Sequence, residues 1–174
     1  FSDLIRLAKQ VEINGNSGSG KSSLMNAGLL PLVDQGWLWP RTDLARWLRI
    51  GPMMPGQCPV AMLAESLARF SRAVLKEPAE MAVIRPLLES DDRALADWLR
   101  SRKREDTAFL FAIDQFEELF TFADRDERGR FDRLLATALA DADCPLFLIS
   151  TVRADFLDRF AEDLPHLADA SNRA

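Results

Sequence analysis

Residues 15–30 of this sequence read GNSGSGKSSLMNAGLL, and the stretch opens with the pattern GxxxxGK(S/T). Glycine has no Cβ, so the three glycines before the lysine let the chain wrap closely and turn successive backbone N–H groups toward one anion. In such a loop the lysine reaches the β- and γ-phosphates of a nucleotide and the next hydroxyl ligates Mg²⁺. These roles are predicted for Lys21 and Ser22, in a phosphate-binding loop between a strand and a helix.

The expected nucleotide contacts run through the whole loop into the first helical turn, because a helix N-terminus presents N–H groups and a positive dipole end to an anion. They are Gly15, Asn16, Ser17, Gly18, Ser19, Gly20, Lys21, Ser22 and Ser23. Residues 21–30 are rich in Ala, Leu and Met, which predicts a helix that ends at Pro31. The alternative is a glycine-rich turn that fits the pattern by accident, and a second motif further along the chain argues against it.

The composition is that of one soluble globular domain. The chain has 174 residues, of which 48% are hydrophobic and 28% charged, which suits a single α/β domain with a sizeable core. A net charge of −5 argues against a dedicated nucleic-acid partner. No apolar run approaches the ~18 residues that a membrane span needs, so we expect no membrane partner for this segment and a cytoplasmic location. Phe1 is not a native start, so residues 1–174 are expected to be a fragment of a larger multidomain protein.

The cysteine and histidine content excludes two classes of site. Cys58 and Cys144 show neither a disulfide framework nor metal-ligand spacing, and both are expected to be reduced and structural. His166 is the single histidine, which argues against a zinc site and against a serine–histidine triad in this segment.

Strand and helix patterns alternate along the chain, which predicts a parallel sheet covered by helices. The expected strands are residues 11–14, 46–50, 108–113 and 145–152. The last two are almost entirely apolar, as in a buried parallel sheet, whereas Glu12 interrupts the first. The expected helices are residues 21–30, 59–76, 79–88, 93–102, 116–122, 131–139 and 153–164, with a connector at 37–43 and a charged turn or helix start at 124–130.

A second candidate site element is the apolar strand AFLFAI, which ends at Asp114. Downstream of a phosphate loop, an aspartate at a strand tip is predicted to hold Mg²⁺ through water. The alternative is an aspartate that only caps the next helix.

The residues after Asp114 bear on hydrolysis, which needs a group that polarises the attacking water. Gln115 can orient a water but cannot accept its proton. If a helix begins at Gln115, then Glu117 and Glu118 lie on the same side as Asp114, and one of them can act as the base. The alternative is that both are ordinary acidic residues at a helix N-terminus, where the dipole favours them.

The third motif is ISTVR, residues 149–153, at the tip of the last expected strand. Ligands bind outside the carboxyl ends of the strands in such sheets, so Thr151 and Arg153 are candidates to sense the γ-phosphate. The alternative for Arg153 is an ordinary surface ion pair. No guanine-recognition pattern of the NKxD type is present in the sequence, so ATP is the expected nucleotide.

Taken together, GNSGSGKSSLMNAGLLP, FAIDQFEELF and LISTVRADF resemble the STAND class of signal-transduction ATPases. In particular the chain is similar to bacterial novel-STAND NTPase domains, which are often joined to WD40 or other repeats. The resemblance runs over residues 11–165. It implies a P-loop NTPase fold, a three-layer αβα sandwich with a parallel sheet of order 5-1-4-3-2 whose fifth strand is not expected within this chain.

The resemblance also implies residue roles and an activity. Lys21 and Ser22 match the Walker A pair, Asp114 the Walker B metal residue, and Arg153 the arginine that ends the sensor-one strand. Glu117 and Glu118 match the distal acidic pair. The implied activity is a nucleotide-driven switch that is closed with ADP and homo-oligomeric with ATP, with effector and repeat sensor domains in cis.

Three functions therefore stay open. The first is the ATP-binding, slowly hydrolysing core of a regulatory STAND protein. The second is a nucleotide-binding assembly module with negligible turnover, which Gln115 favours because a glutamate often follows the metal-binding aspartate in related ATPases. The third is a DNA-handling ATPase, which the acidic net charge disfavours.

Overall fold

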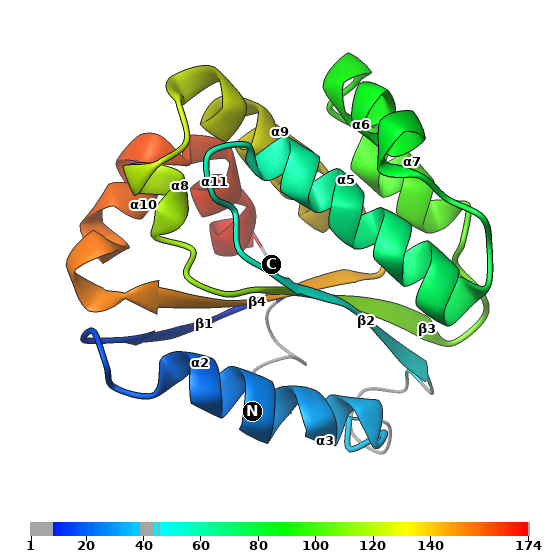
Figure 1. Cartoon of the computed structure of the whole chain (residues 1–174), viewed down its shortest axis with the longest axis horizontal. Helices are drawn as coiled ribbons and strands as arrows, with labels where there is room; N and C mark the ends of the chain where they lie inside the picture. The colour runs from blue at the N-terminus through cyan, green and yellow to red at the C-terminus, as the bar shows by residue number, and fades with distance from the viewer. Residues whose placement is uncertain (1–8, 39–43, 45, 174) are drawn as a thin grey trace.

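The computed structural model describes residues 9–38, 44 and 46–173, which form a parallel sheet between two helical layers (Figure 1). The strands within these ranges are β1 (Gln10–Gly15), β2 (Arg46–Met53), β3 (Thr107–Ile113) and β4 (Leu146–Arg153). Their order is β1-β4-β3-β2, and each neighbouring pair is parallel. The predicted three-layer αβα sandwich is confirmed, and its 1-4-3-2 core order is the observed one.

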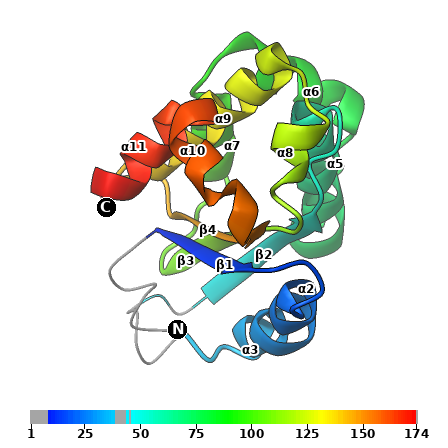
Figure 2. The same ribbon diagram turned by 90° about the vertical axis from the view of Figure 1, so that its left-hand side faces the viewer.

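One helical layer is a single continuous helix that follows β1. It consists of α2 (Lys21–Ser23), the π-helical segment η1 (Leu24–Leu29) and α3 (Leu30–Asp34). Figure 2 shows this helix on one face of the sheet and the other helices on the opposite face.

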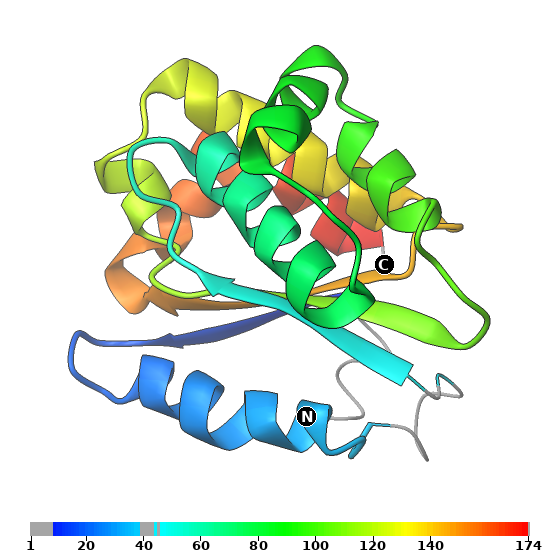
Figure 3. The same cartoon turned by 45° about the vertical axis from the view of Figure 1, so that its right-hand side comes forward.

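The second layer holds the remaining helices of the described ranges, and Figure 3 shows α5 lying over β2. They are α5 (Pro59–Phe70) with η2 (Ser71–Leu75), α6 (Met81–Ser90), α7 (Ala94–Arg100), α8 (Glu118–Thr121), α9 (Arg125–Ala140), η3 (Ala154–Phe156), α10 (Leu157–Asp163) and α11 (Pro165–Arg173). None of the described helices is long and apolar enough to cross a membrane.

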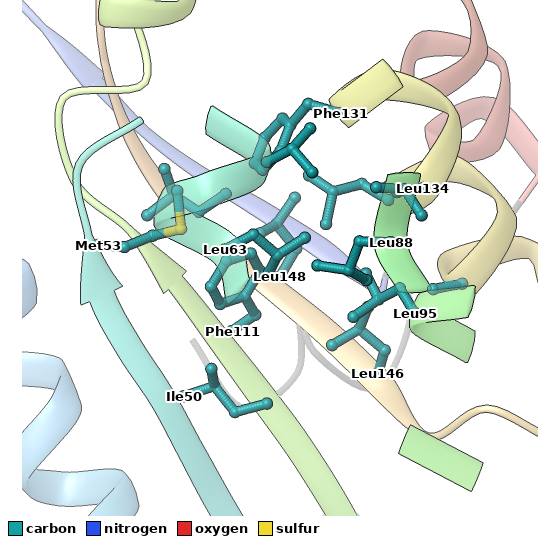
Figure 4. Packing of buried hydrophobic residues seen from close by; sticks show 14 of the residues in the cluster. Ile50, Met53, Leu63, Leu88, Leu95, Phe111, Phe131, Leu134, Leu146 and Leu148 are labelled. Atoms are coloured by element: carbon teal, nitrogen blue, oxygen red, sulfur yellow. The ribbon is translucent and has the colours of Figure 1, made fainter. Parts of the chain in front are cut away.

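The sheet separates two hydrophobic cores. The larger core lies under the second layer, where Leu63 of α5 and Phe131 of α9 pack with Phe111 and Leu148 of the sheet (Figure 4). Every residue of β3 is buried, which explains why the run that predicted it is apolar. The smaller core lies between the helix after β1 and the face of the sheet that this helix covers. Its residues include Met25, Leu30, Val33, Trp47, Leu110 and Ile149.

The helix after the loop does not end at Pro31, so this prediction was wrong. Pro31 lies in the first turn of α3, and the helix continues to Asp34. Proline lacks the N–H that an interior helical position donates. Here the missing donor falls where the π-helical pattern of Leu24–Leu29 gives way to α-helix, and π-bulges are known to interrupt the regular hydrogen-bond ladder.

The other predicted elements are present with shifted bounds. The charged stretch at residues 124–130 is a helix start, because the Asp124 side chain accepts from Glu127 N at 2.9 Å and caps α9. The helix expected at 116–122 is reduced to α8, and the one expected at 153–164 begins with the 3-10 turn η3. The connector expected at 37–43 lies mostly outside the described residues, and α11 was not predicted.

The polar character of β1 has a structural reason. Among the described strands β1 lies at the edge of the sheet and pairs only with β4. Glu12 is half-buried and accepts a 2.9 Å hydrogen bond from Gln10 Nε2. Residues two apart on a strand share a face, so Gln10 supports the charge that burial would otherwise leave unpaired. Burial still raises the pKa of Glu12 above its ordinary value.

Both cysteines are free. Cys58 is exposed ahead of α5, and Cys144 is buried ahead of β4. Burial raises the pKa of the Cys144 thiol to about 11, which leaves it protonated and unreactive at neutral pH.

Candidate nucleotide-binding site

The candidate phosphate loop connects the end of β1 to the start of α2. Gly18 has φ +76° and Gly20 has φ +83°, both in the left-handed region that side chains with a Cβ rarely adopt. Lys21 Nζ donates to the carbonyl oxygens of Gly15 and Asn16, both at 2.9 Å. The lysine ammonium therefore lies against the backbone of the loop and brings its positive charge to the loop itself.

Asp114 follows the last residue of β3 and is only 8% exposed. Its Oδ1 accepts from Ser22 Oγ at 2.7 Å, Thr151 Oγ1 at 2.6 Å and Gln115 N at 3.0 Å. Its Oδ2 accepts from Asn26 Nδ2 at 3.2 Å. Four donors from three separate segments thus orient one buried carboxylate toward the loop.

Ser22 and Asp114 are the two predicted metal residues, and the structure brings them into direct contact. A hydroxyl oxygen and a carboxylate oxygen are the hard donors that Mg²⁺ prefers, and Mg²⁺ commonly takes one or two protein ligands beside phosphate and water. The donor set therefore fits Mg²⁺.

Asn26 contacts Asp114 through its side-chain amide, and the sequence did not predict this role. Ser22 and Asn26 are four residues apart on one helix, so both face Asp114. The available signal was a polar residue at this spacing within an otherwise apolar helical run. Thr151 was expected to sense a phosphate, but in the structure its hydroxyl donates to Asp114 and accepts from Gln115 N at 2.9 Å.

The segment after Asp114 is not a helix that starts at Gln115, so the condition under which Glu117 and Glu118 would share a side with Asp114 is not met. Gln115 has φ +54° and forms a left-handed turn, held by its N–H bonds to Asp114 and Thr151. Its side-chain Nε2 lies 3.4 Å from Met54 Sδ, in the loop after β2. The turn delays the start of α8 to Glu118.

This turn sends Glu117 and Glu118 to different surroundings. Glu118 Oε2 accepts a 3.0 Å hydrogen bond from Gly56 N, in the loop between β2 and α5. Glu117 Oε2 is buried and has no hydrogen-bond partner within the described part of the chain. A buried carboxylate oxygen without a donor is rare in folded proteins, and of the pair only Glu117 has such an oxygen among the described residues.

Arg153 ends β4, where it is the register partner of Gly15 at the start of the loop. Its Nε and Nη2 donate to the two oxygens of Asp155 at 3.0 and 2.7 Å, and its Cζ lies 5.4 Å from the centre of the Phe156 ring. The surface ion pair considered for Arg153 is thus present. The Asp155 carboxylate, and to a smaller degree Glu117, raise the pKa of Arg153.

The strand ends explain why these residues meet. In a parallel sheet all carboxyl ends lie at one edge, so Gly15, Asp114 and Arg153 come from three adjacent strands to the same place. The arrangement offers two cations for phosphate, two oxygens for a metal ion, and one buried carboxylate oxygen without a donor among the described residues.

The family model described as Novel STAND NTPase 1 (nSTAND1) matches residues 2–174 of the chain. The match therefore covers the sheet, both helical layers and every residue of the candidate site. No curated protein matches the chain significantly.

Proposed function

Since the chain belongs to the Novel STAND NTPase 1 family, we propose that it binds ATP with Mg²⁺ and hydrolyses it slowly, as the engine of a signalling switch. The observation that carries the proposal is the 2.7 Å hydrogen bond from Ser22 Oγ to Asp114 Oδ1, between residues 92 positions apart. A loop hydroxyl and a strand-tip carboxylate that meet beside a glycine-rich loop are the parts needed to hold a metal-bound triphosphate.

The loop is proposed to bind the phosphates through its backbone N–H groups and through Lys21. The proposed contacts are Gly15, Asn16, Ser17, Gly18, Ser19, Gly20, Lys21, Ser22 and Ser23. Lys21 Nζ, which donates to two loop carbonyl oxygens, needs only to exchange these for phosphate oxygens, which carry more negative charge.

Ser22 and Asp114 are proposed to hold Mg²⁺, which would neutralise charge on the phosphates when bound. Thr151 and Asn26 act on Asp114 rather than on the nucleotide, because their hydrogen bonds fix the orientation of its two oxygens. Such supporting hydrogen bonds keep a ligand carboxylate in its binding geometry and limit the reorganisation that binding requires.

Glu117 is proposed to position or activate the attacking water, and Arg153 to interact with the γ-phosphate. Of the two glutamates, Glu117 is favoured because its Oε2 has no partner, whereas Glu118 already accepts from Gly56 N. Glu118 instead links the segment after β3 to the loop after β2, so it is proposed to support the site structurally.

The proposed switch follows from differential binding. A nucleotide changes a conformational equilibrium only by binding one state more tightly than the other, and contacts made by the γ-phosphate supply that difference. We propose that residues 1–174 are the NTPase core of a larger cytoplasmic protein, closed with ADP and homo-oligomeric with ATP, with effector and sensor domains in cis.

A second candidate is a nucleotide-binding assembly module with negligible turnover. Gln115 favours it, because its amide contacts Met54 Sδ and cannot accept a proton in any case. The two candidates share the same nucleotide site and differ in whether bound ATP is consumed.

The experiment that tests nucleotide binding is a thermal melt of the chain with Mg-ATP, with Mg-ADP and with neither. A ligand present at ~100 times its Kd that binds only the folded state adds about 2.7 kcal/mol, which corresponds to a rise in Tm of several degrees. Lys21→Ala should abolish this rise, and Lys103→Ala, an exposed lysine elsewhere, should preserve it. Absence of any rise in the wild-type chain would refute the proposed site.

Turnover then separates the two candidates. Phosphate release from Mg-ATP that is lost in Lys21→Ala supports the hydrolysing core. Nucleotide binding without release of phosphate over many hours supports the assembly module.

A further inference from the structure

The turn after β4 places a carboxylate directly on the proposed γ-phosphate sensor. Arg153 and Asp155 form a two-bond fork, in which Nε and Nη2 each donate to a different carboxylate oxygen. A guanidinium recognises a carboxylate and a phosphate through this same planar pair of donors. The Arg153 donors bound to Asp155 are therefore one of the donor pairs through which a phosphate can be bound.

The position of Asp155 is set by the packing of its neighbour. Asp155 lies in η3, and the next residue, Phe156, stacks on Phe120 with ring centres 6.0 Å apart. The guanidiniums of Arg153 and Arg159 lie 5.4 and 5.9 Å from the Phe156 ring centre. The turn is thus anchored to α8 and α10, which keeps the carboxylate within reach of Arg153.

The same carboxylate lies in the field of the loop lysine. The Arg153 hydrogen bonds lower the pKa of Asp155 most, and the Lys21 charge lowers it further. Asp155 is thus an anion that pairs with Arg153 and also interacts electrostatically with Lys21. Both members of the ion pair are substantially exposed, with 41% of the Arg153 and 58% of the Asp155 side chain accessible. An exposed ion pair is weak, so another anion can displace it.

We propose that Asp155 is an internal competitor for the terminal phosphate of a nucleoside triphosphate. The inference rests on the proposed function, in which Arg153 interacts with that phosphate. A triphosphate whose terminal phosphate binds the Nε–Nη2 pair displaces Asp155 from Arg153, whereas a diphosphate leaves the pair intact. Asp155 therefore weakens triphosphate binding selectively and sets the ratio of the two affinities, which decides how readily a switch enters its triphosphate state.

The test measures affinities of the chain for the Mg²⁺ complexes of a non-hydrolysable ATP analogue, AMP-PNP, and of ADP, by isothermal titration calorimetry. Asp155→Asn should tighten AMP-PNP binding about two- to fivefold, the range expected for loss of one competing exposed ion pair, and should leave ADP binding nearly unchanged. Asp158→Asn, which removes an exposed carboxylate three residues further on, is the matched control and should change neither affinity.

Arg153→Gln makes the test specific, because Asp155→Asn should have no effect on AMP-PNP binding in that background. An equal gain for both nucleotides would overturn the inference and indicate general charge repulsion. No gain for AMP-PNP would overturn it too. In the absence of nucleotide, wild type and Asp155→Asn should melt at the same temperature. This result excludes a merely structural effect of the substitution.

Failure of the proposed function and failure of the inference about Asp155 give different results. If neither nucleotide binds wild type, the proposed function is refuted and the inference with it. If both bind but Arg153→Gln leaves the affinity ratio unchanged, nucleotide binding stands, while the role of Arg153 and the inference are wrong. If Arg153→Gln alters the ratio and Asp155→Asn does not, only the inference is wrong.

Discussion

Thr151 Oγ1 donates a 2.6 Å hydrogen bond to Asp114 Oδ1, from β4 to the tip of β3. The same hydroxyl oxygen accepts from Gln115 N at 2.9 Å, so one buried side chain holds both the carboxylate and the left-handed turn that follows it. This pairing connects the proposed metal residue to the segment that carries Glu117. Substitutions that disturb it should therefore affect nucleotide binding and stability together.

Thr151→Val should weaken Mg-nucleotide binding and destabilise the fold. Valine keeps the shape but removes the donor to Asp114 and leaves Gln115 N with one acceptor fewer. We expect a loss of about 1–3 kcal/mol in the free energy of unfolding, and a Kd for Mg-ADP raised about tenfold. Urea unfolding and calorimetric titration measure the two effects. Thr137→Val, on α9, is the control, and an unchanged Kd in Thr151→Val would contradict the orienting role.

Glu117→Gln should reduce ATP turnover far more than Glu118→Gln. Loss of a general base typically costs about a hundredfold or more in rate, and a glutamine at position 117 cannot accept a proton. Glutamine at position 118 still offers an oxygen to Gly56 N, so turnover and stability should change little. Steady-state phosphate release with saturating Mg-ATP is the measurement. The reverse ranking would identify Glu118 as the base.

Glu12→Gln should stabilise the fold at neutral pH and not at acidic pH. Burial raises the folded-state pKa of Glu12 above 4.5, so the folded chain binds this proton more tightly than the unfolded chain. The contribution of Glu12 to stability therefore falls as pH rises from about 4.5 through its folded pKa, because the buried charge must form. Glutamine carries no such charge.

Urea unfolding of both proteins between pH 4 and pH 7 gives the difference directly. The gain in free energy of unfolding should grow with pH and then level off. The exposed acid Glu162, changed to glutamine, should show no comparable growth. A gain that is the same at every pH would mean that titration of Glu12 is not its cause.

Asp132→Ala should undock α11. Asp132 is 1% exposed, and its carboxylate accepts from His166 N at 3.2 Å and Leu167 N at 2.8 Å, at the start of that helix. Removing it takes one acceptor from each of two N–H groups, at a cost of about 2–4 kcal/mol in the free energy of unfolding. Urea unfolding measures the loss in free energy of unfolding. Amide hydrogen exchange that becomes faster only in α11 would show that the loss arises from that helix. Loss below 1 kcal/mol would contradict the capping role.

Much of the fold was readable from local patterns. The apolar runs that predicted residues 108–113 and 145–152 are β3 and β4, because a strand covered on both faces is apolar along most of its length. The amphipathic pattern after Pro59 is α5 with η2. Predictions failed where the same residue type can either end a helix or lie within one. A proline ends most helices. Here the helix continues through Pro31, because its hydrogen-bond pattern already changes from π to α at that point.

The sequence by itself determined the loop with its Lys21 and Ser22, the strand that ends at Asp114, and the alternation that makes a parallel sheet. These features depend on neighbours within a few residues: side-chain size, backbone freedom and the period of the apolar pattern. Only the tertiary structure decided which of Glu117 and Glu118 has a buried oxygen without a donor, and which side chains hold Asp114. Those outcomes depend on hydrogen bonds between strands and on the left-handed turn at residue 115, and such contacts between distant segments leave no periodic signal in the chain.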